Sequence, residues 1–277
     1  MGGRVAHYRL LVTDVDGTLL PPDRQVLPSV REAVRLARAR GVRVCLATGR
    51  MWRSVRPYAE AVAADSPAVL FNGAVVYDFA RGQVLERHTL DPHAARAALE
   101  VLRDFPDLRP HVFTLEAVYV DRLDAVSRAY QERDGIHAEE VDDLVDRLPP
   151  EPVKVLVVGE PRRLSELDSA LAVRAPGLRR VFSEPDFLEL LPAGVSKATG
   201  LRALCRALGV GLGEVVAVGD NPNDLEMVQE AGLGIAVANA HPVLKQAARF
   251  VTSSEGGEAI AEVVRRFLLD GLDATGR

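Results

Sequence analysis

Short apolar runs alternate with amphipathic helical patterns at both ends of this 277-residue chain, and that alternation restricts the fold more than any other feature. The first part has apolar, β-branched runs at 9–13, 42–47 and 68–71 and helical patterns at 28–40 and 52–63. The last part has apolar runs at 215–218 and 234–237 and helical patterns at 197–208, 222–230, 242–247 and 256–269. Apolar strands that alternate with helices indicate a parallel sheet covered on both faces. The two ends of the chain therefore predict one doubly wound α/β domain.

The segment between these two parts lacks the regular alternation of strands and helices and has prolines at irregular intervals. It has helical patterns near 94–104, 123–132 and 164–174 and strand-like runs near 112–120, 153–158, 178–182 and 187–191. An acidic stretch at 139–146 is expected to be a solvated face. We therefore predict an inserted α+β domain at 83–191 and a core domain formed by 1–82 and 192–277.

Composition and charge exclude several classes of protein. With 48% hydrophobic and 26% charged residues, the chain can bury a substantial core. No run approaches the roughly 18 consecutive apolar residues of a membrane helix, and the first residues do not resemble a signal peptide. A net charge of −5 with dispersed arginines gives no nucleic-acid footprint, and Cys45 and Cys205 are expected to be buried thiols. We expect a soluble cytoplasmic protein that binds neither membranes nor nucleic acid, whose oligomeric state the sequence does not define.

Two carboxylates follow the first predicted strand, in the run Asp14-Val15-Asp16-Gly17-Thr18. Ligands of open α/β sheets bind at the carboxyl ends of the strands, where this run lies. Carboxylates so close together repel each other unless a cation or a shared proton compensates, and hard oxygen ligands favour magnesium. The alternative is an ordinary Asp-Gly turn, which explains the glycine without a metal.

Two further polar fragments are expected at strand-to-helix junctions on the same sheet edge. Thr48-Gly49-Arg50 offers a hydroxyl and backbone N–H groups to an anion, unless it is simply a helix N-cap. Gly219-Asp220-Asn221-Pro222-Asn223-Asp224 contains two carboxylates. Asn221 and Pro222 suffice to begin a helix, so these carboxylates exceed what capping requires.

Lysine is scarce in this chain, which has 3 lysines against 31 arginines. Lys197 opens a predicted helix, where its charge opposes the helix dipole. The ordinary explanation would be a solvated surface lysine. Taken together, however, the fragments supply four carboxylates, a hydroxyl, glycine amides and one cation at one edge. This inventory suits phosphoryl transfer, which requires positioning and charge stabilisation from a protein.

In this order and spacing, the fragments resemble the haloacid dehalogenase superfamily of phosphohydrolases, and specifically its Cof-like branch. The resemblance extends to Phe71-Asn72-Gly73-Ala74, Gly194-Val195-Ser196-Lys197 and Ala238-Asn239-Ala240, and it covers nearly all of the two terminal segments. It implies a Rossmann-like core. It also implies a large α/β cap within the 149 residues that separate Thr48 from Lys197 (197 − 48).

The resemblance further implies a role for each site residue. Asp14 would attack phosphorus to form an aspartyl phosphate, and Asp16 would protonate the leaving alcohol and later activate water. Thr48 and Lys197 complete the implied catalytic set, with Lys197 offsetting the charge of the nucleophile and the phosphate. The implied phosphate-binding residues are Val15, Thr48, Gly49, Lys197 and Asn223. Magnesium would be held by Asp14, the backbone carbonyl of Asp16 and Asp220, with Asp224 behind these ligands.

These residues predict a magnesium-dependent phosphatase that hydrolyses a small phosphorylated metabolite, such as a sugar phosphate. Two alternatives stay open. Some sugar phosphomutases share the implied fold and cap type, so a mutase is the second hypothesis. A protein that only senses a phosphate ligand ranks last, because it would be expected to lack a catalytic group and all of them are present.

Overall fold

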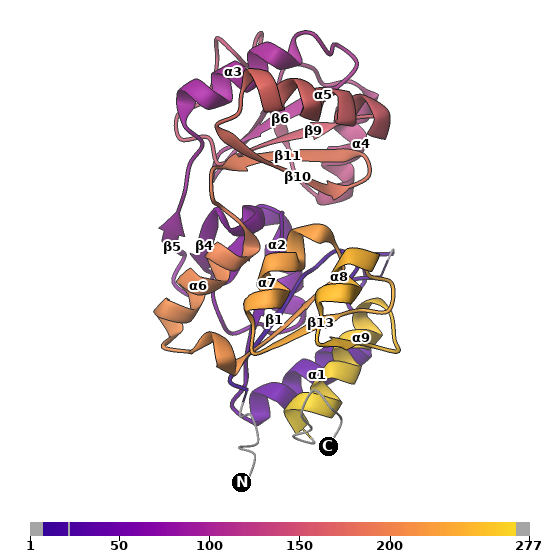
Figure 1. The fold of residues 1–277 in the computed structure, drawn as a ribbon. Helices are drawn as coiled ribbons and strands as arrows, with labels where there is room; N and C mark the ends of the chain where they lie inside the picture. Colours follow the sequence, from indigo (N-terminus) through magenta and orange to yellow (C-terminus); the bar gives the residue numbers. More distant parts are fainter. Residues whose placement is uncertain (1–7, 22, 270–277) are drawn as a thin grey trace. The chain divides into compact units, whose positions relative to one another are not determined.

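A computed structural model describes residues 8–21 and 23–269 (Figure 1). The chain forms two compact units. Unit 1 takes in the described residues up to Gly49, Val55–Glu86 and those from Ser196 onward, and unit 2 consists of Arg50–Ser54 and Arg87–Val195. Residues 50–54 belong to unit 2 by their contacts, although they were predicted to lie in the core domain.

Unit 1 is built on a five-stranded sheet whose strands are all parallel, in the order β14-β13-β12-β1-β2. The strands are β1 (Leu10–Thr13), β2 (Arg43–Leu46), β12 (Val215–Gly219), β13 (Leu233–Ala236) and β14 (Phe250–Val251). In the register of β1, Thr13 lies beside Val218 of β12 and beside Leu46 of β2. Because the strands run in the same direction, their carboxyl ends meet at one edge. The predicted doubly wound α/β core is confirmed.

Helices cover this sheet and are held by apolar side chains. They are α1 (Pro28–Ala39), α6 (Lys197–Leu208), α7 (Leu225–Glu230), α8 (Pro242–Ala247) and α9 (Gly256–Val263), whereas α2 (Trp52–Ala61) begins in unit 2 and belongs to unit 1 from Val55 onward. Leu10 and Val12 of β1 share a buried cluster with Leu204 of α6 and Met227 of α7. Figure 1 shows α1 beside α9, and these two helices pack against each other.

Two helices predicted in unit 1 differ from their expected form. The predicted helix at 222–230 begins as a 3-10 turn, Pro222–Asp224, and only then continues as α7. The side chain of Asp224 accepts hydrogen bonds from the backbone N–H groups of Asp220 and Asn221. These bonds favour a 3-10 turn, which is tighter than a turn of α-helix. The predicted helix at 256–269 is α9 followed by a π-helix over Val264–Leu269.

A small second sheet of unit 1 has the order β3-β4-β5. Its strands are β3 (Ala68–Leu70), β4 (Val75–Asp78) and β5 (Gln83–Arg87). A 3-10 turn at Phe71–Gly73 joins β3 to β4, and an isolated parallel bridge links Ala47 to Val69. This bridge brings the turn after β3 next to the carboxyl end of β2.

Unit 2 has the predicted α+β composition, with a six-stranded sheet in the order β10-β11-β9-β6-β7-β8. The strands are β6 (Arg109–Phe113), β7 (Val118–Val120), β8 (Ala138–Glu140), β9 (Lys154–Val158), β10 (Leu178–Glu184) and β11 (Phe187–Pro192). The helices are α3 (Pro92–Leu102), α4 (Ala125–Asp134) and α5 (Pro161–Arg174). Leu99 of α3 and Leu164 of α5 pack with Val155 of β9 in one buried cluster.

Two predictions for unit 2 are wrong in part. The single strand expected near 112–120 is two strands, β6 and β7, because Thr114 and Ala117 pair through their backbones and the Thr114 hydroxyl accepts the Ala117 N–H to close a turn. Within the acidic stretch, Leu144 and Val145 are buried in the cluster of unit 2 rather than solvated. Among the described residues, no helix is both long and apolar enough to cross a membrane.

Candidate active site

Asp14 lies where the chain leaves the central strand β1. Its backbone N–H donates to the Val218 carbonyl (2.9 Å), which continues the parallel pairing with β12 and fixes the position of the residue. The chain then turns back, because the N–H groups of Leu19 and Leu20 both donate to the Val15 carbonyl. The side chain of Asp14 is buried, with 5% of the residue exposed.

Gly17 allows the loop after β1 to approach the loop after β12. It has a φ of +77°, which side chains rarely permit, and an added Cβ would lie 2.4 Å from Oδ2 of Asp220. On the other side of this contact, the Thr18 hydroxyl donates to Oδ1 of Asp220 (2.8 Å). The Asp-Gly step is therefore a turn, and the absence of a side chain there also makes room for a second carboxylate.

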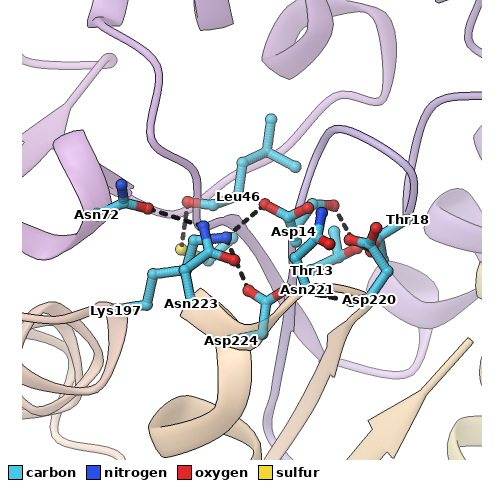
Figure 2. A network of polar contacts seen from close by, with 11 residues as sticks. Thr13, Asp14, Thr18, Leu46, Asn72, Lys197, Asp220, Asn221, Asn223 and Asp224 are labelled. Carbon is cyan, nitrogen blue, oxygen red and sulfur yellow. Dashed lines mark hydrogen bonds and ion pairs between the residues drawn. The ribbon is translucent and has the colours of Figure 1, made fainter. Parts of the chain in front are cut away.

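Lys197 is the first residue of α6, and it is buried with 1% exposed. The helix begins with a capping box between Ser196 and Thr199, so Lys197 is not needed to start it. Its Nζ lies 2.6 Å from Oδ1 of Asp14 and 2.7 Å from Oδ1 of Asp224 (Figure 2). The interpretation of Lys197 as a solvated surface lysine is wrong.

Gly73 permits the close approach that places α6. It has a φ of +100°, and an added Cβ would lie 1.9 Å from the backbone oxygen of Ser196. Any side chain at this position would push the first turn of α6, and with it Lys197, away from the turn after β3. The glycine of Phe71-Asn72-Gly73-Ala74 thus contributes to the position of the lysine.

Asp220 and Asp224 complete a group of three buried carboxylates. Asp14, Asp220 and Asp224 each offer a ligand atom, and these atoms all lie within 4.8 Å of one another. Both oxygens of Asp224 already accept hydrogen bonds, Oδ1 from Lys197 and Oδ2 from the N–H groups of Asp220 and Asn221 (3.1 Å each). Asp14 and Asp220 are therefore better suited than Asp224 to hold an ion directly.

The charges of this group do not balance. Three carboxylates and one ammonium carry a net charge of −2 when all are ionised. Burial raises the pKa of Asp14 well above its usual range, and the charge of Lys197 opposes the rise without cancelling it. Burial, together with the charge of Asp224, raises the pKa of Asp220 to about 7. Burial by itself would lower the pKa of Lys197, but Asp14 and Asp224 outweigh it and raise the pKa, so the lysine stays protonated.

This imbalance fits a divalent cation. Buried carboxylates repel one another and take up protons unless a positive charge compensates them. Carboxylate oxygens are ligands that magnesium accepts, and the ion usually keeps several waters when one or two carboxylates hold it. The donor set of Asp14 and Asp220 thus fits a hard divalent cation such as magnesium.

Thr48 follows β2 and is buried at the same edge of the sheet. Its N–H donates to the Val69 carbonyl and its own carbonyl accepts the N–H of Asn72, both at 2.9 Å. These bonds hold the Thr48-Gly49 turn beside the turn after β3. Asn72 was given no predicted role, yet its Oδ1 accepts a hydrogen bond from Nδ2 of Asn223 (3.1 Å, Figure 2).

The side chain of Asp16 does not belong to the group of three clustered carboxylates, although its charge contributes to the raised pKa of Asp14. It is 31% exposed, and its Oδ1 is 3.7 Å from Nη2 of Arg24. The turn that carries it is braced by Asn239, which sequence reasoning left without a role. The Nδ2 of Asn239 donates to the Gly17 carbonyl (2.9 Å), and its Oδ1 accepts the N–H of Gly256 (3.1 Å). The run Ala238-Asn239-Ala240 was the signal that pointed to it.

Comparison with known proteins identifies the family of the chain. The family described as haloacid dehalogenase-like hydrolase matches residues 11–264. YxeH of Bacillus subtilis (strain 168) is 30% identical over 272 residues, which cover 95% of this chain and 99% of that protein. The pyridoxal phosphate phosphatase YbhA of Escherichia coli (strain K12) is 29% identical over 281 residues, with 94% and 99% covered. A crystal structure of a haloacid dehalogenase-like hydrolase from Bacteroides thetaiotaomicron is 28% identical, with a TM-score of 0.84 over 94% of this chain and 99% of that one.

The chain belongs to the haloacid dehalogenase-like hydrolase family, as its motifs predicted. Several of the relatives that match nearly its whole length are named phosphatases, and the chain is accordingly a phosphoric monoester hydrolase.

Proposed function

We propose that this protein is a magnesium-dependent phosphatase that hydrolyses a small phosphorylated metabolite through an aspartyl phosphate. The observation that carries the proposal is the setting of Asp14. Its carboxylate is fixed at the end of the central strand and lies 2.6 Å from a buried ammonium, Lys197. An enzyme that transfers a phosphoryl group to a carboxylate needs both a fixed nucleophile and a positive charge beside it.

In the first half of the reaction, an oxygen of Asp14 attacks phosphorus and the bond from phosphorus to the alcohol oxygen breaks. Asp16 gives its proton to that oxygen, so the alcohol leaves neutral. In the second half, Asp16 takes a proton from water, which attacks the phosphorus and releases phosphate and the free Asp14 carboxylate. Asp16 is partly exposed whereas Asp14 is buried, and this difference in access to solvent supports the division of work.

The remaining residues of the site would hold the phosphate and the metal. Val15 and Gly49 would offer backbone N–H groups, and Thr48 and Asn223 their side chains, to the phosphate oxygens. Asp14, Asp220 and the backbone carbonyl of Asp16 would hold magnesium, and Asp224 would fix the loop of Asp220 and the position of Lys197. When bound, the ion would supply positive charge to the phosphate and to the crowded carboxylates.

The substrate is proposed to be a small phosphate monoester, such as a sugar phosphate or pyridoxal phosphate, the compound named for the relative from Escherichia coli. Unit 2 is proposed to be the cap that selects among such esters, through apolar and arginine side chains on its sheet. The cytoplasmic location, and the absence of nucleic-acid and membrane partners, stay predictions.

The test is phosphate release from a panel of sugar, nucleotide and cofactor monophosphates in the presence of magnesium. We expect the wild type to release phosphate and Asp14→Asn to be inactive, whereas Asp186→Asn, at an exposed position of unit 2, serves as the matched control and stays active. Loss of the wild-type activity on the whole panel, or full activity of Asp14→Asn, would contradict the proposal. Interconversion of sugar 1- and 6-phosphates without phosphate release would indicate a phosphomutase instead.

A further inference from the structure

Asn72 and Asn223 form a side-chain amide pair whose hydrogen bonds are incomplete. One hydrogen bond joins them, from Nδ2 of Asn223 to Oδ1 of Asn72 (3.1 Å, Figure 2). The other end of each amide, Nδ2 of Asn72 and Oδ1 of Asn223, is buried and has no hydrogen-bond partner among the described residues. A buried amide end without a partner destabilises a protein, so its presence calls for an explanation.

The pair joins two loops of the site within unit 1. Asn72 is fixed by its N–H bond to the carbonyl of Thr48, and it lies in the turn after β3. Asn223 lies in the 3-10 turn between Asp220 and Asp224. The incomplete bonds therefore lie between the turn that is bonded to Thr48, a proposed phosphate residue, and the loop that carries Asp220, a proposed metal ligand.

The backbone of Asn72 offers a simpler explanation, which can be separated from a functional one. Its φ is +53° and its ψ is 32°, a left-handed conformation that asparagine and glycine tolerate better than other residues. If conformation alone selected this residue, glycine would serve as well. The buried amide bonded to Asn223 is what glycine would lack.

We propose that Asn72 is a positioning residue for the phosphate site, and that its amide sets the orientation of Asn223. The inference rests on the proposed function, since the ligand is the phosphate group of the substrate. Phosphate oxygens accept hydrogen bonds and donate few, so an amide that faces them must present its N–H group. With phosphate bound, Nδ2 of Asn72 donates to Oδ1 of Asn223, and Nδ2 of Asn223 donates to the phosphate.

This arrangement requires both amides to turn over together relative to the ligand-free state. The two ends of an amide exchange places by a half-turn about one bond, with almost no change in shape. After the exchange the pair is still joined by one hydrogen bond, and the outer N–H of Asn223 has found an acceptor. Phosphate thus supplies a partner for the open end of the Asn223 amide, whereas the open end of Asn72, now its Oδ1, still has none among the described residues.

Orthovanadate with magnesium is a probe of this site that does not depend on knowing the substrate. We would measure its affinity by calorimetry for the wild type, Asn72→Gly, Asn223→Ala and the double variant, with the Tm of each unliganded protein. Asn72→Gly keeps the left-handed backbone and removes the amide. Ala63→Gly is the matched control, because Ala63 also has a positive φ (49°) and is exposed.

We expect Asn72→Gly to weaken vanadate binding about tenfold, because Nδ2 of Asn223 is no longer oriented towards the charged ligand, while its unliganded Tm stays close to that of the wild type. The double variant should lose no more vanadate affinity than the single variant that binds vanadate more weakly, because the two residues act as one unit. Asn72→Asp should bind more weakly than Asn72→Gly, because a carboxylate accepts the N–H of Asn223 and turns it away from the ligand.

The inference would be overturned if Asn72→Gly bound vanadate within twofold of the wild-type affinity. It would also be overturned if the fold-loss of affinity in the double variant equalled the product of the fold-losses in the two single variants. These outcomes are distinguishable from failure of the proposed function. A wild type that binds vanadate but releases no phosphate from any ester would refute the proposed function. The vanadate affinities of the wild type and Asn72→Gly would still decide the inference about Asn72. A wild type that binds no vanadate would refute both.

Discussion

A buried lysine lies in each unit, and the two differ in how their charges are matched. In unit 2, Lys154 of β9 is 2.8 Å from Glu189 of β11, so one positive charge meets one negative charge. In unit 1, Lys197 meets two carboxylates, and Asp220 brings a third within 4.8 Å of them. A buried ion pair is common in structural networks, whereas surplus charge is costly unless a ligand compensates it. The unmatched charge, rather than burial, marks the candidate active site.

The neighbours of Lys154 support a structural role for the pair in unit 2. Its Nζ lies 4.7 Å from the centre of the Phe113 ring, and His111 on the same strand as Phe113 packs edge-on against Tyr130 of α4 (4.9 Å). Burial lowers the pKa of His111 to about 4, so the ring is neutral near pH 7.

The largest expected effect comes from exchanging lysine for arginine in each region. Lys197→Arg keeps the charge but places a larger planar group among Asp14 and Asp224, so we expect kcat to fall about a hundredfold or more. Lys154→Arg should keep kcat within about twofold and lower stability through overpacking, by about 1–3 kcal/mol. Steady-state kinetics and urea unfolding measure both. Near-normal turnover of Lys197→Arg would show that the site does not require a compact ammonium.

Removing one partner of the pair in unit 2 should destabilise the protein without touching the site. Lys154→Met leaves the carboxylate of Glu189 buried and unpaired, at a cost of about 3–5 kcal/mol in the free energy of unfolding. Lys154→Met with Glu189→Leu removes both charges and should recover most of that loss. Urea titration of the three proteins is the measurement. A double variant as unstable as the single one would mean that the pair contributes more than mutual neutralisation.

Acid should weaken unit 2 through His111. The folded protein binds a proton at this residue only near pH 4, whereas the unfolded chain binds it near pH 6.5. Stability is therefore fully present above about pH 6.5 and falls as the pH drops towards 4, by about 3 kcal/mol at most. His111→Gln should remove this part of the pH dependence. Equal slopes of unfolding free energy against pH for both proteins would contradict the assignment.

The smallest expected effect is stabilisation by magnesium, which should depend on the carboxylates of unit 1. An ion at a concentration of about 100 times its Kd stabilises the folded state by about 2.7 kcal/mol. We expect added magnesium to raise the Tm of the wild type and of Glu189→Gln, and to leave that of Asp220→Asn nearly unchanged. Thermal unfolding with and without the ion measures the difference. An equal rise for Asp220→Asn would place the ion elsewhere.

The meeting of Asp14 and Asp220 could be predicted because it follows from topology. Each residue comes directly after a strand, and the carboxyl ends of parallel strands share an edge. The position of Lys197 needed more than topology, because it depends on Gly73 letting α6 approach the turn after β3. The role of the lysine followed instead from its scarcity and from the family resemblance.

Other features depend on contacts between distant residues and could not be predicted. Lys154 opens an apolar strand, and its burial depends on Glu189 on a neighbouring strand, a pairing that the sequence does not show. The amide of Asn72 is hydrogen-bonded to Asn223, 151 residues away, and the sequence does not show this contact. The 3-10 turn before α7 arises because the side chain of Asp224 bonds to the backbone of its own loop and competes with regular helical hydrogen bonds. The spacing of apolar residues does not show this competition.

The most direct test of the central claim is a search for the phosphate that Asp14 is proposed to carry. Asp16→Asn should still form the aspartyl phosphate from an aryl phosphate, whose phenolate leaves without the proton that Asp16 would give, and should hydrolyse it slowly because water activation is lost. After incubation with a phosphate ester, borohydride reduces an acyl phosphate to an alcohol, which peptide mass spectrometry can locate. We expect substrate-dependent modification at residue 14. Modification at any other carboxylate, or none with an aryl phosphate that the wild type hydrolyses, would contradict the account.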